Sequence, residues 1–267
     1  MNTASQRRET FRDLHRAGLF LIPNPFDMGS ARLLEHLGFE ALATTSSGFA
    51  ATLGRNDQHT TRAELVDHVR AMCAAVSLPV NVDAEACFPL EPGGVGETVE
   101  LFAEAGAAGV SIEDFDHTTN AILPIDEASA RVAQAVGAAR PHGVVITARA
   151  EALLYGSTDT DDVIARLHAY REAGADVLHA PGVKSAGEIR RVVDVGLPVN
   201  VLAMPGVPSA SELSSLGVRR ISTGGALAWS AYGAFLRAAT ELRDLGTYDY
   251  FEGVIERPTR ETAFGDR

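Results

Sequence analysis

Two acidic residues lie two positions apart at the end of an apolar run, in the stretch LPVNVDAEACF from Leu78 to Phe88. Successive side chains of a β-strand point to opposite faces, so we expect Asp83 and Glu85 to share one face. Two carboxylates at this separation repel each other, and their burial costs free energy unless a positive group lies between them. The pair therefore predicts a cation at this end of the strand.

Other apolar runs end in residues that could act together with this pair. In chain order, the run ends carry Asn24, Thr45, Ser46, Ser47, Asp83, Glu85, Glu113, Asp114, Arg149, Glu151, His179, Met204 and Thr223. Any one of these residues could simply cap a helix or lie in a solvated loop. That explanation does not account for several acids at equivalent ends of adjacent strands, because their negative charges would repel one another. A hard divalent cation with oxygen ligands, most simply Mg2+ with Mn2+ as an alternative, would relieve this repulsion. His and Cys are too few at these positions for a zinc site.

The elements that must position these residues form a repeating pattern. Eight apolar runs rich in Val, Ile and Leu cover Leu19–Asn24, Glu40–Ser46, Leu78–Glu85, Ala108–Phe115, Gly143–Glu151, Ala175–Pro181, Leu197–Met204 and Val218–Gly225. Helical segments lie between and after them, near 29–37, 61–76, 96–106, 126–139, 159–173, 185–195, 209–216 and 226–243. Alternating buried strands and helices indicate a parallel sheet that is covered on both faces. Eight units in 267 residues predict a closed (β/α)8 TIM barrel, whose active sites lie at the carboxyl ends of the strands.

An open doubly wound sheet is the main alternative fold. It would more often carry a glycine-rich phosphate turn after its first strand, and PNPFDMGS is not such a turn. Asp27 or Ser30 can cap the helix that begins near Gly29, and a glycine follows several of the other helices. These glycines are Gly38, Gly106, Gly174 and Gly217. Because no linker or low-complexity tract interrupts the pattern, we expect one barrel domain over residues 1–267 with a C-terminal helical tail.

Composition excludes several classes of partner. The formal net charge of −12 argues against binding to nucleic acid or to an anionic membrane surface, since both attract basic patches. The two cysteines, Cys73 and Cys87, form no disulfide framework and fit a reducing compartment. The charged N-terminal segment has no apolar core typical of a secretory signal, and no apolar run is long enough to span a bilayer. We therefore expect a cytoplasmic protein.

Five stretches of the chain carry a resemblance to a known superfamily. They read NPFDMGSARLLEHLGFEALATTSSGFAATLGRND, VNVDAEACF, GVSIEDF, ITARAEALL and GVRRISTGGALAWSAYGAFLRAA. Together they resemble the isocitrate lyase/phosphoenolpyruvate mutase superfamily, and most of all its short phosphoenolpyruvate-mutase-like branch. The resemblance covers nearly the whole chain, and the motifs DxE, IED and AR occur in the same order at the ends of the third, fourth and fifth strands.

The resemblance implies a magnesium site at the mouth of the barrel. In this superfamily the metal binds a 2-oxo acid through its carboxylate and oxo oxygens. Asp83, Glu85 and Glu113 match the acids that surround the metal. Asp57, in the motif LGxxD, matches an acid that reaches the metal through water, so it belongs to both the metal site and the substrate site.

The resemblance also implies roles for residues that face the substrate. Arg149 matches the arginine that pairs with the substrate oxyanion, and His179 matches the histidine of the sixth strand. The stretch Thr45-Ser46-Ser47 matches a segment that donates hydrogen bonds to the substrate carboxylate or phosphonate. Asn120, in HTTN, matches the Thr-Asn pair of a gating loop after the fourth strand. The resulting catalytic candidates are Arg149, Glu113, Asn120 and His179.

The loop after the fourth strand departs from the superfamily pattern. It reads DFDHTTNAILP and contains no Cys, Lys or Arg. The cysteine acid of the isocitrate and methylisocitrate lyases is therefore absent. Thr118 stands where the phosphonate enzymes carry a lysine. Both differences argue against those particular activities.

These residues favour an enzyme that acts on a small 2-oxo or 2-hydroxy dicarboxylate through an enolpyruvate-like intermediate. We expect C–C bond cleavage of the lyase, decarboxylase or oxaloacetate-hydrolase type. Phosphonate chemistry, of the mutase or hydrolase type, is one alternative, and a non-catalytic barrel that binds 2-oxo acids is another.

The C-terminal part of the chain predicts a homo-oligomer, either a dimer or a tetramer. Superfamily members assemble from dimers that exchange their last helix. The apolar segment from Ala226 to Leu245 and the aromatic tail TYDYFEGVIERP after it fit the same arrangement.

Overall fold

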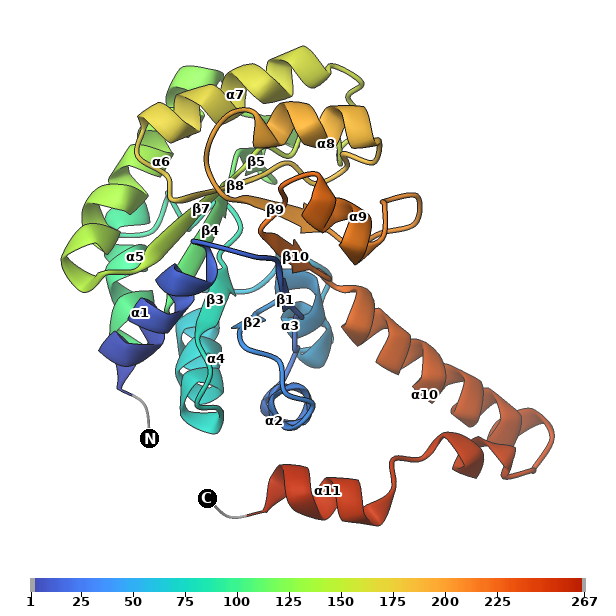
Figure 1. Ribbon diagram of the computed structural model, residues 1–267. Coiled ribbons are helices and arrows are strands. Elements are labelled where there is room, and N and C mark those ends of the chain that lie inside the picture. Colours follow the sequence, from blue (N-terminus) through green and yellow to red (C-terminus); the bar gives the residue numbers. More distant parts are fainter. Residues whose placement is uncertain (1–2, 266–267) are drawn as a thin grey trace.

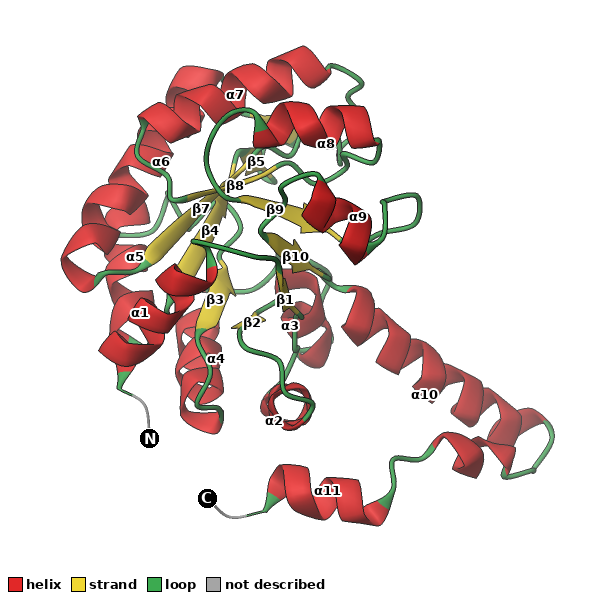
Figure 2. Cartoon of the chain, viewed as in Figure 1, coloured by secondary structure: helices red, strands yellow, loops and turns green. Residues whose placement is uncertain are grey.

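The computed structural model describes residues 3–265, so the outermost residues of the predicted domain lie outside the described range. Eight parallel strands form one sheet in the order β1-β10-β9-β8-β7-β4-β3-β2, and helices surround it (Figures 1 and 2). The strands are β1 (Phe20–Ile22), β2 (Leu42–Ala43), β3 (Val80–Asp83), β4 (Gly109–Glu113), β7 (Val145–Arg149), β8 (Val177–His179), β9 (Val199–Leu202) and β10 (Arg220–Ser222). Each lies within one of the eight predicted apolar runs.

The sheet closes between β1 and β2. The Ala43 N–H donates to the Pro23 carbonyl at 3.1 Å, and the Asn24 side chain donates to the Thr44 carbonyl at 2.7 Å. These bonds join the two end strands of the sheet, and the predicted (β/α)8 barrel is confirmed.

All eight predicted helices are present. They are α2 (Met28–His36), α4 (Arg62–Ala75), α5 (Gly94–Glu104), α6 (Ile125–Ala139), α7 (Thr160–Glu172), α8 (Ala186–Val193), α9 (Ala210–Ser215) and α10 (Ala226–Asp244). Asp27 caps α2 and forms a capping box with Ser30, as the sequence indicates. The four predicted helix-ending glycines have positive φ angles, a conformation that costs a glycine little.

Several elements have no counterpart among the predicted ones. They are the helices α1 (Ala4–Leu14) and α3 (Ser46–Thr52), the short 3-10 turn η1 (Arg140–His142), and the hairpin of β5 (Phe115–Asp116) and β6 (Ala121–Ile122). The 3-10 turn η2 (Asp249–Gly253) and the helix α11 (Arg257–Phe264) lie where the C-terminal helical tail is predicted. α1 covers the amino ends of the strands. Its Arg8 and Arg12 donate to the carbonyls of Ala107 and Gly143, at 2.9 Å each. The helix thereby closes the floor of the barrel.

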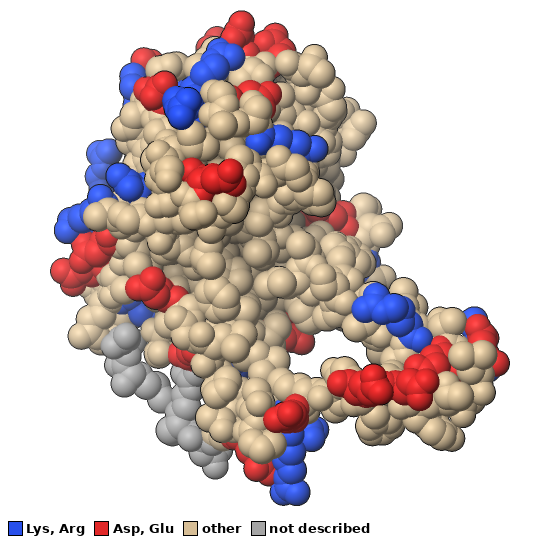
Figure 3. Space-filling view, turned by 45° about the vertical axis from the view of Figure 1, so that its right-hand side comes forward, with Lys and Arg blue, Asp and Glu red and all other residues tan. Residues whose placement is uncertain are grey.

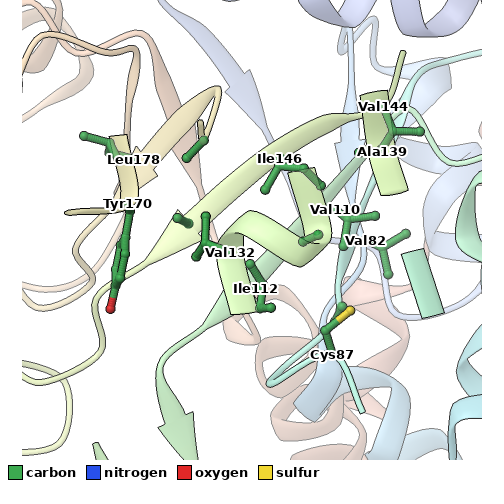
Figure 4. Close-up of a cluster of buried hydrophobic side chains, with 14 of the residues drawn as sticks. Val82, Cys87, Val110, Ile112, Val132, Ala139, Val144, Ile146, Tyr170 and Leu178 are labelled. Atoms are coloured by element: carbon green, nitrogen blue, oxygen red, sulfur yellow. The ribbon is translucent and has the colours of Figure 1, made fainter. Parts of the chain in front are cut away.

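Apolar packing lies mainly between the strands and the surrounding helices. Outward-facing strand residues such as Val82, Val110 and Ile146 pack with helix residues such as Val132 (Figure 4). A smaller cluster seals the floor, where Phe11 of α1 meets Phe20 of β1 edge to face. The apolar core is therefore outside the strands and at the floor, which leaves the upper interior of the barrel available to polar side chains.

The helix α10 does not pack along the barrel. It projects away from β10, and α11 then returns to lie beside α2 (Figure 1). The space-filling view shows an opening between this projecting arm and the body (Figure 3). Among the described residues, no helix combines the length and the apolar character needed to cross a membrane.

Candidate active site

A cavity of about 210 Å3 lies at the carboxyl ends of the strands and extends into the barrel. Its upper lining contains the predicted site residues Thr45, Ser46, Ser47, Asp57, Asp83, Arg149 and His179. Its deeper lining contains Asn81, Ser111, Asn200, Arg220 and Ser222. The barrel therefore brings most of the predicted set to one place, as expected for this end of the fold.

The Arg149 guanidinium is the positive group that the structure places among the strand-end acids. Its Nη1 lies 2.5 Å from Asp83 Oδ1, its Nη2 lies 3.1 Å from Glu113 Oε2, and its Nε lies 2.7 Å from Glu151 Oε1. Burial alone would lower the pKa of Arg149. The charges of Glu151, Glu113 and Asp83 outweigh this effect and hold the pKa well above its ordinary value.

Glu85 lies beside this cluster but outside its ion pairs. The residue follows the end of β3 with a φ angle of 52°, and its side chain is buried. Its Oε1 atom has no hydrogen-bond partner among the described residues. Burial, followed by the charges of Asp83 and Asp57, raises the pKa of Glu85 to about 8. The backbone N–H of Gln58 and the charge of Arg149 offset this rise only in part. Glu85 is therefore close enough to Asp83 and Asp57 to be raised by their charges, and its negative form is poorly compensated.

Glu113 ends β4 and is also buried. It accepts a hydrogen bond from Gln58 Nε2 at 3.0 Å as well as pairing with Arg149. Burial, opposed by the charge of Arg149, raises the pKa of Glu113. The Gln58 Oε1 atom is buried without a described partner. Gln58 thus contacts the site, although the sequence motifs gave no reason to select it.

The predicted substrate-binding segment lies at the start of α3. Thr45 is the N-cap of this helix, and the Ser46 N–H donates to Asp83 Oδ2 at 3.0 Å. Asp57 follows α3; although the residue as a whole is exposed, its carboxylate faces the crowded rim. Loss of contact with water and the charge of Asp83 raise the pKa of Asp57.

His179 ends β8 in the wall of the cavity. Its Nδ1 lies 2.9 Å from the Asn200 carbonyl oxygen, which can only accept a hydrogen bond. Burial and then the charge of Arg149 hold the pKa of His179 well below its ordinary range. The ring is therefore neutral with its proton on Nδ1, and Nε2 carries the free lone pair.

Three predicted site residues do not line the cavity: Glu85 and Glu113 lie beside it, and Asn120 lies on the neighbouring hairpin. Asn120 is exposed in the turn of the β5–β6 hairpin, with a φ angle of 53°. Phe115, at the base of the hairpin, stacks on Tyr155 with 3.7 Å between ring centroids. The hairpin thus stands beside the site, and Asn120 does not line the cavity.

The sequence places Asp114 with the acids at the strand ends, and this prediction is wrong. Its neighbour Glu113 points inward, so Asp114 points outward from the same strand. Its Oδ1 accepts the Glu151 N–H at 2.8 Å, and its Oδ2 accepts from Tyr170 Oη at 2.6 Å and from Arg166 Nη1 at 3.2 Å. Asp114 therefore ties β4 and β7 to α7 behind the site.

The chemistry of the rim carboxylates and their partners decide whether they can hold a metal ion. Among residues 3–265, no three His, Cys, Asp or Glu side chains already surround a common point. Two of the predicted ligands, Asp83 and Glu113, instead pair with Arg149. The donor set nevertheless fits a hard divalent cation. All of the donors are carboxylate oxygens, which hard cations prefer. The negative charge of the rim acids exceeds the single positive charge of Arg149. In addition, the buried Glu85 Oε1 has no described hydrogen-bond partner.

The deeper polar residues were missed in the sequence, although a simple signal could have found them. Asn81, Ser111 and Thr147 each precede a strand-end site residue by two positions. Side chains two apart on a strand share a face, so these residues had to point into the barrel. Arg220 precedes Ser222 by the same spacing.

Comparison with known proteins agrees with this geometry. The chain matches the family model for phosphoenolpyruvate phosphomutase over residues 11–243. An oxaloacetate decarboxylase from Paraburkholderia xenovorans LB400 is 32% identical over 242 residues, which are 86% of this chain and 77% of the relative.

Solved structures give the same result. A Burkholderia cenocepacia J2315 protein that is described only provisionally as a lyase/mutase is 47% identical, with a TM-score of 0.94 over 99% of this chain and 98% of that one. The structure of an oxaloacetate acetylhydrolase in complex with its product oxalate is 26% identical, with a TM-score of 0.87 over 98% of this chain and 95% of that one. The chain therefore belongs to the phosphoenolpyruvate phosphomutase family, within the isocitrate lyase/phosphoenolpyruvate mutase superfamily.

Proposed function

We propose that this protein is a Mg2+-dependent enzyme that cleaves a C–C bond in a small 2-oxo or 2-hydroxy dicarboxylate. The observation that carries the proposal is the rim cluster, defined as Asp57, Asp83, Glu85, Glu113 and Arg149, beside a cavity of about 210 Å3. The relatives named oxaloacetate decarboxylase and oxaloacetate acetylhydrolase support this class of substrate.

The acids of the rim cluster would hold the metal ion. We assign this role to Asp83, Glu85, Glu113 and Asp57, with Mn2+ as an alternative ion. The bound ion would supply a Lewis acid that stabilises negative charge on the substrate oxygens. Thr45, Ser46 and Ser47 would bind the substrate carboxylate through hydroxyl and backbone donors, since all three line the cavity.

Decarboxylation of a 2-oxo dicarboxylate illustrates the reaction. The bond from C3 to the leaving carboxylate breaks, and its electron pair forms the enolate of the remaining 2-oxo acid. The carboxylate leaves as CO2, and a proton added to C3 completes the product. Arg149 donates hydrogen bonds to Asp83 and Glu151 through Nη1 and Nε, and Nη2 forms an ion pair with Glu113. Of the five N–H donors of the guanidinium, the three that make no hydrogen bond to Asp83 or Glu151 can donate to the oxyanion as it develops.

His179 would serve the proton transfer at C3. The neutral ring is fixed by its bond to the Asn200 carbonyl, and its Nε2 is available to exchange a proton near the substrate. Asn120 would act after closure of the β5–β6 hairpin over the cavity. Because the loop has no Lys or Arg, it offers no side-chain cation for a phosphonate, so phosphonate chemistry is not favoured.

A substrate screen tests the proposal. The purified protein with Mg2+ is incubated with oxaloacetate, alkylated malates and citrates, and phosphonopyruvate, and pyruvate, oxalate and phosphate are measured separately. We expect turnover of a carboxylate substrate that is abolished by chelation and by Asp83→Ala. Binding without turnover of any substrate would favour the non-catalytic barrel, and release of phosphate from phosphonopyruvate alone would favour phosphonate chemistry.

We further propose that the chain assembles as a dimer or tetramer through α10. The exposed residues Trp229, Phe235 and Leu236 lie on the projecting helix. A groove of about 500 Å3, mainly apolar, lies on the barrel between α2 and α9 and includes Leu34, Phe39, Val207 and Leu213. An exchanged helix would cover both surfaces, and interfaces of this kind are large and apolar. Light scattering that shows a stable monomer at micromolar concentration would contradict this assembly.

A further inference from the structure

Arg220 is a buried arginine inside the barrel, below the rim cluster. It is 3% exposed and begins β10, where it pairs in register with Asn200 of β9 and Phe20 of β1. Its Nε donates to Asn200 Oδ1 at 2.9 Å, and its Nη2 donates to Thr147 Oγ1 at 3.0 Å. Its Nη1 lies 3.3 Å from His15 Nε2. All of these partners are neutral.

No carboxylate among residues 3–265 forms an ion pair with Arg220. The three hydrogen bonds account for three of its five N–H donors. Burial and then the charge of Arg149 lower its pKa to about 9, so the guanidinium is charged at neutral pH. A buried charge without a counterion costs free energy, and an anion beside it would recover part of that cost.

The cavity of the active site reaches this guanidinium. Arg220 lines it together with Asn81, Ser111, Asn200 and Ser222. The interior of a TIM barrel is usually filled with branched apolar side chains, so a polar inner chamber needs an explanation. The buried Asn81 Oδ1 has no described hydrogen-bond partner. The chamber thus has both space and unused hydrogen-bonding capacity.

We propose that Arg220 forms an inner anion subsite that binds the second carboxylate of an extended 2-oxo dicarboxylate and so selects dicarboxylates over monocarboxylates. The inference rests on the proposed function, in which the rim cluster binds the 2-oxo end of the substrate. The acidic rim repels a free carboxylate, whereas the inner chamber attracts one. The two ends of the cavity therefore impose one direction on the substrate. Arg220 would be a specificity-determining residue.

Binding of two matched 2-oxo acids tests the subsite without any turnover. 2-Oxoglutarate and 2-oxovalerate have the same carbon chain and differ in the second carboxylate, so calorimetry with saturating Mg2+ isolates its contribution. We expect wild type to prefer 2-oxoglutarate by at least about tenfold, as for a charge-assisted hydrogen bond. Arg220→Gln should abolish the preference, and Arg220→Lys should keep part of it.

Arg219→Gln is the matched control, because Arg219 is the adjacent residue and its Nη1 contacts the Gly18 carbonyl near the floor, outside the cavity lining. The control should keep the wild-type preference. Thermal unfolding of each variant checks that it is folded. An equal loss of affinity for both acids in Arg220→Gln would show that Arg220 supports the barrel floor only. No preference in wild type, or equally tight binding of inorganic phosphate through Arg220, would also overturn the subsite.

Kinetics distinguish failure of this inference from failure of the proposed function. If oxaloacetate is turned over, Arg220→Gln should raise KM at least about tenfold. The inhibition constant of oxalate, which is too short to occupy both ends, should change less than about twofold. If wild type binds neither 2-oxo acid, the rim assignment fails. If it binds 2-oxovalerate as tightly as 2-oxoglutarate, only the inner subsite fails.

Discussion

Two acid clusters lie on opposite faces of the same strand end, and they differ in how their charge is balanced. On the outer face, both Asp114 oxygens are bonded, to the Glu151 N–H, to Arg166 and to Tyr170. On the inner face, Glu113 shares Arg149 with two other carboxylates. Nearby, Glu85 Oε1 has no described partner.

The difference separates a structural network from a candidate reaction site. A buried ion pair with all its oxygens satisfied holds elements together, and breaking it is costly. An excess of buried negative charge does not stabilise the fold, so its presence at a cavity indicates a ligand that supplies positive charge. Charge balance therefore assigns different roles to Glu113 and Asp114, which are adjacent in sequence.

The largest expected effect is on stability, in the outer network. Asp114→Asn removes the charge opposite Arg166 and should lower the free energy of unfolding by about 3–5 kcal/mol. Asp162→Asn is the control, since Asp162 pairs with the same arginine at a half-exposed position and should cost no more than about 1 kcal/mol. Urea denaturation measures both. Equal losses in the two variants would remove the distinction between the clusters.

In the rim cluster the main effect should be on turnover. Arg149→Lys keeps the charge but loses the planar donor set. It should reduce kcat about a hundredfold, as for removal of one oxyanion donor, while Mg2+ affinity changes little. Arg131→Lys, at a pair with Glu127 within α6 and outside the cavity lining, should leave kcat unchanged. Full activity of Arg149→Lys would contradict the enolate mechanism.

The charge excess predicts that the rim contains an acid whose removal stabilises the metal-free protein. Because burial raises the pKa of Glu85 from 4.5 to about 8, this carboxyl must take up a proton when the chain folds at neutral pH, which costs free energy. Glu85→Gln removes that cost, and we expect a gain of about 1–3 kcal/mol at pH about 7. The same change should weaken Mg2+ binding. Thermal unfolding with and without Mg2+ measures both effects. A loss of metal-free stability would show that Glu85 is already compensated.

The floor of the barrel offers a smaller, pH-dependent test of the same reasoning. His15 Nδ1 donates to the Phe11 carbonyl at 2.7 Å, and Nε2 faces Arg220. Burial, then Arg220, lower its pKa from 6.5 to about 3. As pH falls, the unfolded chain is therefore protonated first. The neutral His15 ring therefore makes its full contribution to the free energy of unfolding above pH 6.5, and this contribution is lost as the pH falls toward 3.

For His15 alone, the free energy of unfolding should change with pH by up to about 1.4 kcal/mol per pH unit. His15→Gln should remove that part of the slope in urea denaturation at pH about 7 and about 5. His59→Gln, at an exposed position, should leave the slope unchanged. An unchanged slope in His15→Gln would mean that the buried ring is not held neutral.

The barrel and most of the rim could be predicted from local patterns. Each strand is an apolar run that ends in polar residues, and parallel strands bring those ends together. This reasoning placed Asp83, Glu113 and Arg149 at the same rim. Because successive strand side chains point to opposite faces, the same pattern also predicts that Asp114 points out of the barrel and that Thr147 points into it.

Other features depend on contacts between distant segments. α1 is charged and only weakly apolar, and it covers the floor because Phe11, Arg8 and Arg12 find partners on separate strands. Gln58 reaches Glu113 only because the loop after α3 folds over the rim. Neither position has a periodic signal in the sequence.

Calorimetric titration with Mg2+ tests the central claim, that the unbalanced acids of the rim form a metal site for a 2-oxo acid. Wild type should bind one ion, and oxalate should bind only when that ion is present, since it resembles the enolate without its methylene. Asp83→Ala should lose both, whereas Asp162→Ala, in the outer network, should keep both. Equal Mg2+ binding by wild type and Asp83→Ala would contradict the site, and the rim acids would then be no more than partners of Arg149.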